Sequence, residues 1–170
     1  MMEVLIPLAV PVADADAAAN MAQTMASPGS REGLLDGPVC AAVTAAGHVL
    51  VLEQGNNRIQ ALDTGGSAAR LFGGNTSAAF ALKPRTAVDY LDLAVEHTGY
   101  IYVLVRDRDS GGVLALDLYT PDGQFPATTN RVNAGKVGID LFRNAYTLNY
   151  EPMVGGNYVE PSVSFWTPGT

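Results

Sequence analysis

Residues 47–63 read GHVLVLEQGNNRIQALD, which is an alternating strand, a turn at Gly55-Asn56-Asn57 and a second strand. Alternating apolar residues on both sides of a Gly/Asn turn are typical of an antiparallel β-hairpin. The sequence around it contains no Gly-x-Ser-x-Gly elbow and no phosphate loop. Whether this hairpin stands alone or repeats therefore decides the fold.

The hairpin occurs three times along the chain. The segments AVTAAGHVLVL at 42–52, AVEHTGYIYVL at 94–104 and GIDLFRNAYTL at 138–148 align without gaps. A third strand follows each pair, at 59–66, 114–123 and 162–169, and ends in a polar or Pro/Gly turn. The spacing of the copies is close to the roughly 40–50 residues of a propeller blade. The sequence predicts an all-β chain of about three four-stranded β-propeller blades.

The first copy resembles an NHL repeat over residues 38–73. It has an apolar-Gly-x-apolar-x-apolar core, then the turn Gly55-Asn56-Asn57-Arg58-Ile59, and then Leu71-Phe72-Gly73. In the NHL family a strand pair is followed by a G-N-x-R-apolar turn, a third strand and a closing F-G. Residues 106–112 and 153–157 replace that turn in the other two copies. The resemblance implies a propeller of the six-bladed type.

Three residues of this turn are candidates for a structural role, namely Asn56, Asn57 and Arg58. Asn tolerates the left-handed backbone region, and Arg can donate several hydrogen bonds to carbonyls of a neighbouring blade. We expect them to brace the turn.

The chain divides into three parts. Residues 1–12 form an apolar strand, residues 13–37 contain a short N-terminal helix (ADADAAANMAQTMA, 13–26) and a linker, and residues 38–170 form the blades. The blades span about 38–85, 86–131 and 132–170, divided at the Pro- and Gly-rich turns between strands. Outer strands are expected at 68–72 in the first blade and near 124–131 in the second.

Three blades do not close a ring, because a propeller needs at least about four. The prediction is a homodimer in which each N-terminal strand completes the third blade of the partner, giving a six-bladed ring. The alternative is a fragment of a longer propeller, whose exposed blade faces would be sticky.

The composition limits the class of partner. Asp and Glu number 17 against 10 Lys and Arg, for a net charge of −7, and no basic run is present. Nucleic acid is therefore an unfavourable partner. No segment reaches the roughly 18 apolar residues of a membrane span. Cys40 is the only cysteine, so an internal disulfide is excluded. These features favour a cytoplasmic protein, with a secreted form left open.

Four polar residues are candidates for binding: Thr44, Asp92, Glu96 and Asp140. Thr44, Glu96 and Asp140 occupy equivalent places beside the first strand of each copy, which lines the channel of a propeller. Two carboxylates near an axis can hold a cation. The alternative is that these side chains face solvent or cap strand ends. His48 and His97 are not equivalent, and residues 107–112 lack the later Glu of a calcium loop.

The favoured function is a noncatalytic binding or assembly module for protein or small-ligand interaction, since a fold alone indicates no chemistry. No cofactor is expected, with calcium kept as the weaker alternative. The NHL resemblance implies an alternative, a calcium-dependent lactonase-like hydrolase or lyase with its site at the ring axis. Such enzymes have several channel-facing acids, amides or histidines, and only Glu96 and Asp140 approach that set here.

Overall fold

The computed structural model describes residues 26–130, 132, 134–149 and 162–166. All regular structure in this part of the chain is β, with no helix. The strand expected in residues 1–12 lies outside the described residues. So does the helix expected at 13–26, apart from Ala26, which is not helical.

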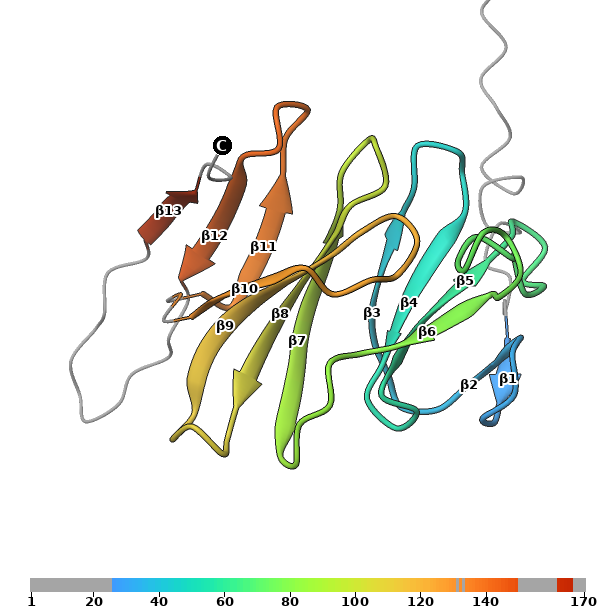
Figure 1. The fold of residues 1–170 in the computed structure, drawn as a ribbon, viewed down its shortest axis with the longest axis horizontal. Helices are drawn as coiled ribbons and strands as arrows, with labels where there is room; N and C mark the ends of the chain where they lie inside the picture. The colour runs from blue at the N-terminus through green and yellow to red at the C-terminus, as the bar shows by residue number, and fades with distance from the viewer. Residues whose placement is uncertain (1–25, 131, 133, 150–161, 167–170) are drawn as a thin grey trace, which may run out of the picture.

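Three antiparallel sheets follow one another along the chain, each a meander in sequence order (Figure 1). The first comprises β3 (Pro38–Val43), β4 (Val49–Glu53), β5 (Arg58–Leu62) and β6 (Ala79–Ala81). The second comprises β7 (Val88–Val95), β8 (Ile101–Asp107), β9 (Val113–Tyr119) and β10 (Ala127–Asn130). The third comprises β11 (Lys136–Ile139), β12 (Ala145–Asn149) and β13 (Ser162–Trp166).

The first strands of the sheets are neighbours, with β3 beside β7 and β7 beside β11. The predicted all-β class is confirmed for the described residues, with four strands in each of the first two sheets and three in the third, and the arrangement is compatible with propeller-like blades. A short parallel pair, β1 (Ser27–Pro28) and β2 (Leu34–Leu35), precedes the first sheet, in a region where the sequence predicted a linker. No helix of the described part has the length and hydropathy that crossing a membrane requires.

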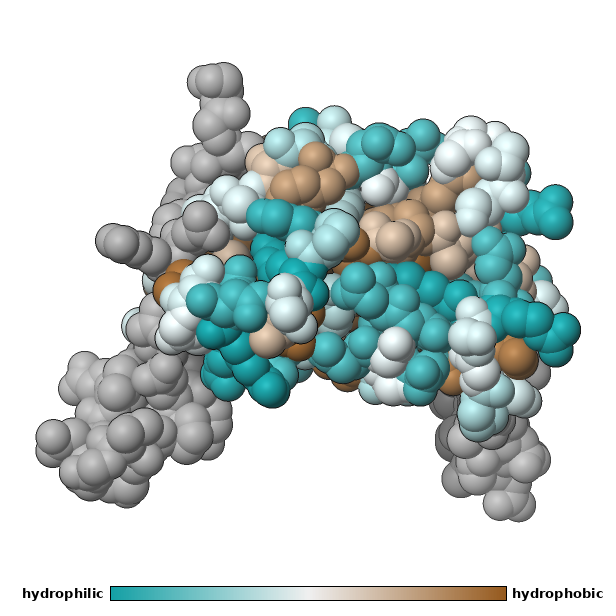
Figure 2. All heavy atoms as spheres, turned by 60° about the horizontal axis from the view of Figure 1, so that its bottom comes forward, coloured by the Kyte–Doolittle hydropathy of each residue, from teal (hydrophilic) through white to brown (hydrophobic). Residues whose placement is uncertain are grey.

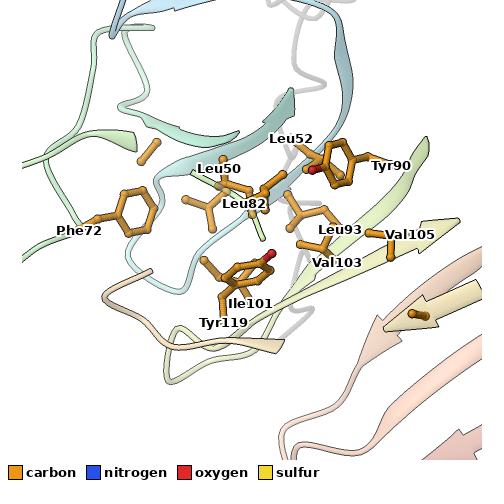
Figure 3. Close-up of a cluster of buried hydrophobic side chains, with 13 residues drawn as sticks. Leu50, Leu52, Phe72, Leu82, Tyr90, Leu93, Ile101, Val103, Val105 and Tyr119 are labelled. Carbon is orange, nitrogen blue, oxygen red and sulfur yellow. The ribbon is translucent and has the colours of Figure 1, made fainter. Parts of the chain in front are cut away.

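Strand β8 shows how the sheets pack, because both of its faces are buried. Ile101 and Val103 belong to a hydrophobic cluster shared with the first sheet, whereas Tyr102 and Leu104 belong to one shared with the third. Figure 3 shows the first cluster between the two sheets. Burial of each such aliphatic side chain contributes roughly 1.5–3 kcal/mol. The continuous apolar run of β8 is therefore the sequence signal of a sheet covered on both sides.

The outer strand of the first sheet differs from the prediction. Residues 68–72 do not form it; β6 does, after a longer excursion of the chain. Ala68 makes only an isolated bridge to Leu62, and the Phe72 side chain enters the core. Phe72 makes an isolated bridge to Ser77, and after this turn the chain returns to pair with β5 as β6. The outer strand of the second sheet, β10, lies within the range expected for it.

The turn residues brace a segment other than the expected one. Arg58 donates to Glu53 Oε1 at 2.7 Å and to the carbonyls of Ser30, Arg31 and Leu34 at 2.7–3.1 Å. These carbonyls precede the first sheet and do not belong to a neighbouring blade. Asn56 donates to Glu53 Oε2 at 2.6 Å. The network therefore holds residues 30–36 against the outward face of the first sheet.

Asn57 links the same turn to the second sheet. Its φ of 51° is in the left-handed region, as expected for Asn at such a turn. Its Oδ1 accepts the Tyr90 hydroxyl hydrogen, and its backbone carbonyl accepts from Leu82 N at 3.0 Å. Asn57 thus acts in the contact between the first two sheets.

The molecular surface is mostly polar on the face drawn in Figure 2, with a band of hydrophobic residues between hydrophilic ones.

Candidate functional site

Three hairpin turns, at residues 44–48, 96–100 and 140–144, lie at one end of the sheets, at the top of Figure 1. Each joins the first two strands of its sheet. We call this end the turn face. Because β3, β7 and β11 are neighbours, the turn face brings together side chains that are about a blade apart in sequence.

The three turns share one backbone geometry. The amides of Thr44, Glu96 and Asp140 donate to the carbonyl four residues later at 2.9, 3.0 and 3.1 Å. The turns at 63–67 and 120–124 have the same bond. The fourth residue has a positive φ in all five turns, and these residues are Gly47, Gly66, Gly99, Gly123 and Arg143. Arg143 therefore stands where the other four turns have glycine, which adopts this conformation without steric cost.

Two of the predicted site residues cap their own turns. Thr44 Oγ1 accepts from His48 N at 3.1 Å, and Asp140 Oδ1 accepts from Asn144 N at 2.9 Å. Burial alone would raise the pKa of Asp140, but its hydrogen bonds from Asn144, Phe142 and the Tyr146 hydroxyl outweigh it and lower that pKa. These caps are the structural role that the sequence had left as the alternative.

Glu96 occupies the equivalent place and behaves differently. Its side chain is fully buried, and Oε1 accepts a hydrogen bond from the Thr98 hydroxyl. Oε2 accepts no hydrogen bond within the described structure. Nε of Arg143 lies 3.3 Å from this oxygen, and the Nδ1 atom of the His97 imidazole lies 3.9 Å from it.

Arg143 crosses from the third sheet to the second. Its guanidinium carbon lies 4.8 Å from the Tyr100 ring centre, and Nη2 donates to Thr98 Oγ1 at 3.2 Å. The side chain is about half exposed. A guanidinium on an aromatic face is a favourable contact that does not require burial.

A pocket of about 410 Å³ opens between the three turns. Thr44, Glu96, Asp140 and His97 all line it, together with five apolar residues, Val43, Ala45, Val95, Ile139 and Leu141. A second hollow of about 270 Å³ adjoins it between the first two sheets, sharing Thr44 and His97 and lined further by Leu71, Phe72 and Pro121. His48 also lines this hollow, and its buried Nδ1 has no hydrogen-bond partner in the described structure.

Asp92 lies apart from the other three candidates and does not line the pocket. Its Oδ2 accepts from Val137 N at 2.9 Å, and its Oδ1 lies 3.3 Å from Lys136 Nζ. Asp92 therefore joins β7 to the first strand of the third sheet. Gln54 makes the matching link between the first two sheets, since it donates to Val88 O and accepts from Tyr90 N, both at 2.9 Å.

Metal ligation finds little support in the described residues, where no group of three His, Cys, Asp or Glu is placed to hold an ion. In the 107–112 turn, Asp107 Oδ1 accepts from Asp109 N, and Asp109 Oδ2 accepts from Ala87 N, both at 3.1 Å. Asp107 therefore caps the hairpin between β8 and β9, and Asp109 ties this hairpin to the segment before β7.

Sequence reasoning missed Arg143, Leu141 and Phe142. The signal was present in the alignment, because the third copy has Arg where the first two have Gly47 and Gly99, and Leu-Phe where they have Ala-Ala and His-Thr. No protein-family model matches this chain, and no curated protein matches it in sequence.

Proposed function

We propose that this chain is a noncatalytic binding and assembly module. In this proposal two chains contribute NHL-like propeller blades to one closed ring, and the turn face forms one end of that ring. The observation that carries the proposal is the equivalence of the sheet faces. Within the chain, each sheet has one face suited to the preceding sheet and one face suited to the following sheet.

On the face of the first sheet that would meet a preceding sheet, residues 30–36 cover β4 and β5, whereas β3 is left open. Val95 of β7 packs against the cluster shared with the first sheet, and its equivalent Ile139 of β11 packs against the cluster shared with the second. The equivalent residue of β3 is Val43, which is 64% exposed. Exposure of a residue whose two counterparts are packed indicates a missing neighbour.

The third sheet has the complementary unused face. Leu52 and Leu104 are wholly buried against the following sheet, whereas their equivalent Leu148 is 42% exposed. Val163, paired with Leu148 across the strands, is also exposed. The described sheets thus end with β3 open on one side and with Leu148 and Val163 open on the other.

A second copy satisfies both faces at once. The third sheet of each copy would pack on the first sheet of the other, and a two-fold axis closes the ring without leaving an open contact. The second chain would place its own three turns at the same end of the ring. The NHL resemblance of residues 38–73 supports a propeller of this size.

The alternative, a calcium-dependent hydrolase or lyase, is less well supported. The side-chain oxygens of Thr44 and Asp140 accept hydrogen bonds from their own turns. Glu96 therefore remains as the buried acid of the pocket. A thermal shift on adding Ca²⁺, abolished in a Glu96→Gln, Asp140→Asn variant, would favour the enzyme over the binding module.

The decisive experiment is the absolute mass in solution, measured by light scattering behind a sizing column. We expect a dimer for the full chain and a monomer for Leu148→Lys, because a lysine on the open face opposes packing. Thr129→Lys adds the same charge on an exposed position of β10 and should remain dimeric. A well-folded monomeric wild-type protein, or a dimer unaffected by Leu148→Lys, would overturn the two-copy ring.

A further inference from the structure

The turn at 140–144 departs from the other four turns of its kind in three ways. Where those have small or polar residues, it has Leu141 and Phe142, whose exposed fractions are 71% and 83%. Where those have glycine, it has Arg143 with a φ of 67°. The backbone hydrogen bonds are unchanged.

Each departure is unfavourable for a turn that only reverses the chain. Exposed Leu and Phe gain no burial in this chain, and a non-glycine residue is strained at a positive φ. Turn positions ordinarily take Gly, Asn, Asp or Ser. Three such choices in successive residues indicate a turn whose side chains contact something outside the sheet.

Glu96 defines the chemistry beside this turn. Its carboxylate is fully buried at the pocket, and its Oε2 accepts no hydrogen bond in the described structure. An unsatisfied buried carboxylate oxygen is costly, and a charged donor is its strongest partner. Arg143 Nε approaches to 3.3 Å but belongs to a half-exposed side chain that also contacts Thr98 and Tyr100.

The charge balance favours a cation in this pocket. Glu96 and Asp140 contribute two carboxylates against one guanidinium, from Arg143. The whole chain carries a net charge of −7, which attracts basic partners and repels acidic ones. The walls formed by Val43, Val95 and Ile139 suit an aliphatic stem.

We propose that the turn face binds a segment of a partner protein through a lysine or arginine side chain flanked by apolar residues. The charged head replaces Arg143 as the partner of Glu96 Oε2, and its stem lies on the aliphatic walls. Leu141 and Phe142 cover the flanking apolar residues. This inference rests on the proposed binding function and names its ligand class.

The test is a titration of the ¹⁵N-labelled full chain with an acetylated pentapeptide amide, Gly-Leu-Arg-Leu-Gly, followed by amide chemical shifts. We expect saturable shifts confined to the three turns that line the pocket, at 44–48, 96–100 and 140–144. The matched control peptide has citrulline for arginine, which keeps the shape and removes the charge. It should bind at least about tenfold more weakly, the size expected for one charged hydrogen bond.

Two variants test the named residues. Glu96→Gln keeps the shape of the buried side chain, and Phe142→Ser alters only an exposed residue, so the second remains informative if the first is poorly folded. Each should weaken binding at least about tenfold. Asp122→Asn removes one charge from another turn on the same end and should bind as wild type does.

Equal binding of the arginine and citrulline peptides, or unchanged binding by both variants, would overturn the inference. Shifts scattered over the surface, or absence of binding, would do the same. A dimeric protein that fails to bind the peptide would contradict only the ligand class. A monomeric protein that binds it would contradict only the two-copy ring.

Discussion

The Nε atom of Arg143, in the turn between β11 and β12, lies 3.3 Å from Oε2 of Glu96, in the turn between β7 and β8. One partner is about half exposed and the other is fully buried. A buried charge depends on its partner more strongly than an exposed one does. Arg143 also holds a left-handed backbone conformation, which glycine would adopt more easily.

Arg143→Gly sets these two effects against each other. Relief of the left-handed conformation should stabilise the fold by about 1 kcal/mol. Loss of the ion pair and the Tyr100 contact should cost more, although less than the roughly 3–5 kcal/mol of a fully buried pair, since Arg143 is half exposed. We expect a net loss of about 1–2 kcal/mol in the free energy of unfolding, measured by urea denaturation.

A double-mutant cycle isolates the pair. Arg143→Gly combined with Glu96→Gln should be less destabilised than the sum of the single variants, because the neutral amide no longer needs a cation. Additive effects, or a stabilised Arg143→Gly variant, would show that the pair contributes little.

Asp117 anchors the second sheet from inside. It receives two hydrogen bonds from Arg85, at 2.6 and 2.8 Å, and one from the Thr128 hydroxyl at 2.7 Å. The Asp117 side chain is fully buried and that of Arg85 nearly so. Asp117→Ala leaves a buried guanidinium without its main partner, so we expect a loss of about 3–5 kcal/mol in thermal or urea unfolding.

A matched control is the exposed pair of Asp89 and Arg108. Solvent screens this pair, so Asp89→Ala should change stability little. A similar loss for both variants would mean that burial does not govern these pairs.

The strand pattern of this fold could be predicted from the sequence because it depends on local alternation. The equivalence of residues 42–52, 94–104 and 138–148 placed Val43, Val95 and Ile139 at matching positions, and the register of each strand pair agrees. The outer strand of the first sheet could not be placed in the same way. Phe72 is as apolar as a strand residue, and only the tertiary core shows that it turns inward.

The candidate site was only partly predictable. Equivalence along the chain indicated that Thr44, Glu96 and Asp140 share one end of the sheets, and the pocket has all three. It could not distinguish a cap from a buried acid, because that depends on side-chain length. Thr44 and Asp140 are short enough to accept a backbone hydrogen bond of their own turn, whereas the longer Glu96 side chain reaches the Thr98 hydroxyl and Arg143 of the third sheet.

Arg58 should not tolerate replacement by lysine. It donates to one carboxylate and three carbonyls through a planar group, and an ammonium cannot reach all of them. We expect Arg58→Lys to cost about 1.5–3 kcal/mol in the free energy of unfolding. Hydrogen exchange should rise in residues 30–36, which these bonds hold. Arg108→Lys, at an exposed pair, serves as the control, and an unchanged exchange pattern in Arg58→Lys would contradict the bracing role.

Cys40 and Tyr90 predict how stability depends on pH above neutrality. Burial, with the nearby Asp92 charge, raises the pKa of Cys40 from 9.0 to about 12, and burial raises that of Tyr90 from 10.0 to about 12. Between about pH 9 and 12 the unfolded chain loses these protons while the folded chain keeps them, so stability falls as pH rises. The guanidinium chloride concentration at the midpoint of unfolding should therefore decrease from pH 8 to pH 11. In Cys40→Ala this decrease should be smaller in the lower part of that pH range.

Alkylation gives a second measurement. Native Cys40 should react with iodoacetamide at pH 8.5 at least tenfold more slowly than in denaturant, because only the thiolate is nucleophilic. Identical pH profiles for the wild-type and Cys40→Ala proteins, together with rapid native alkylation, would show that folding does not raise the pKa of the thiol.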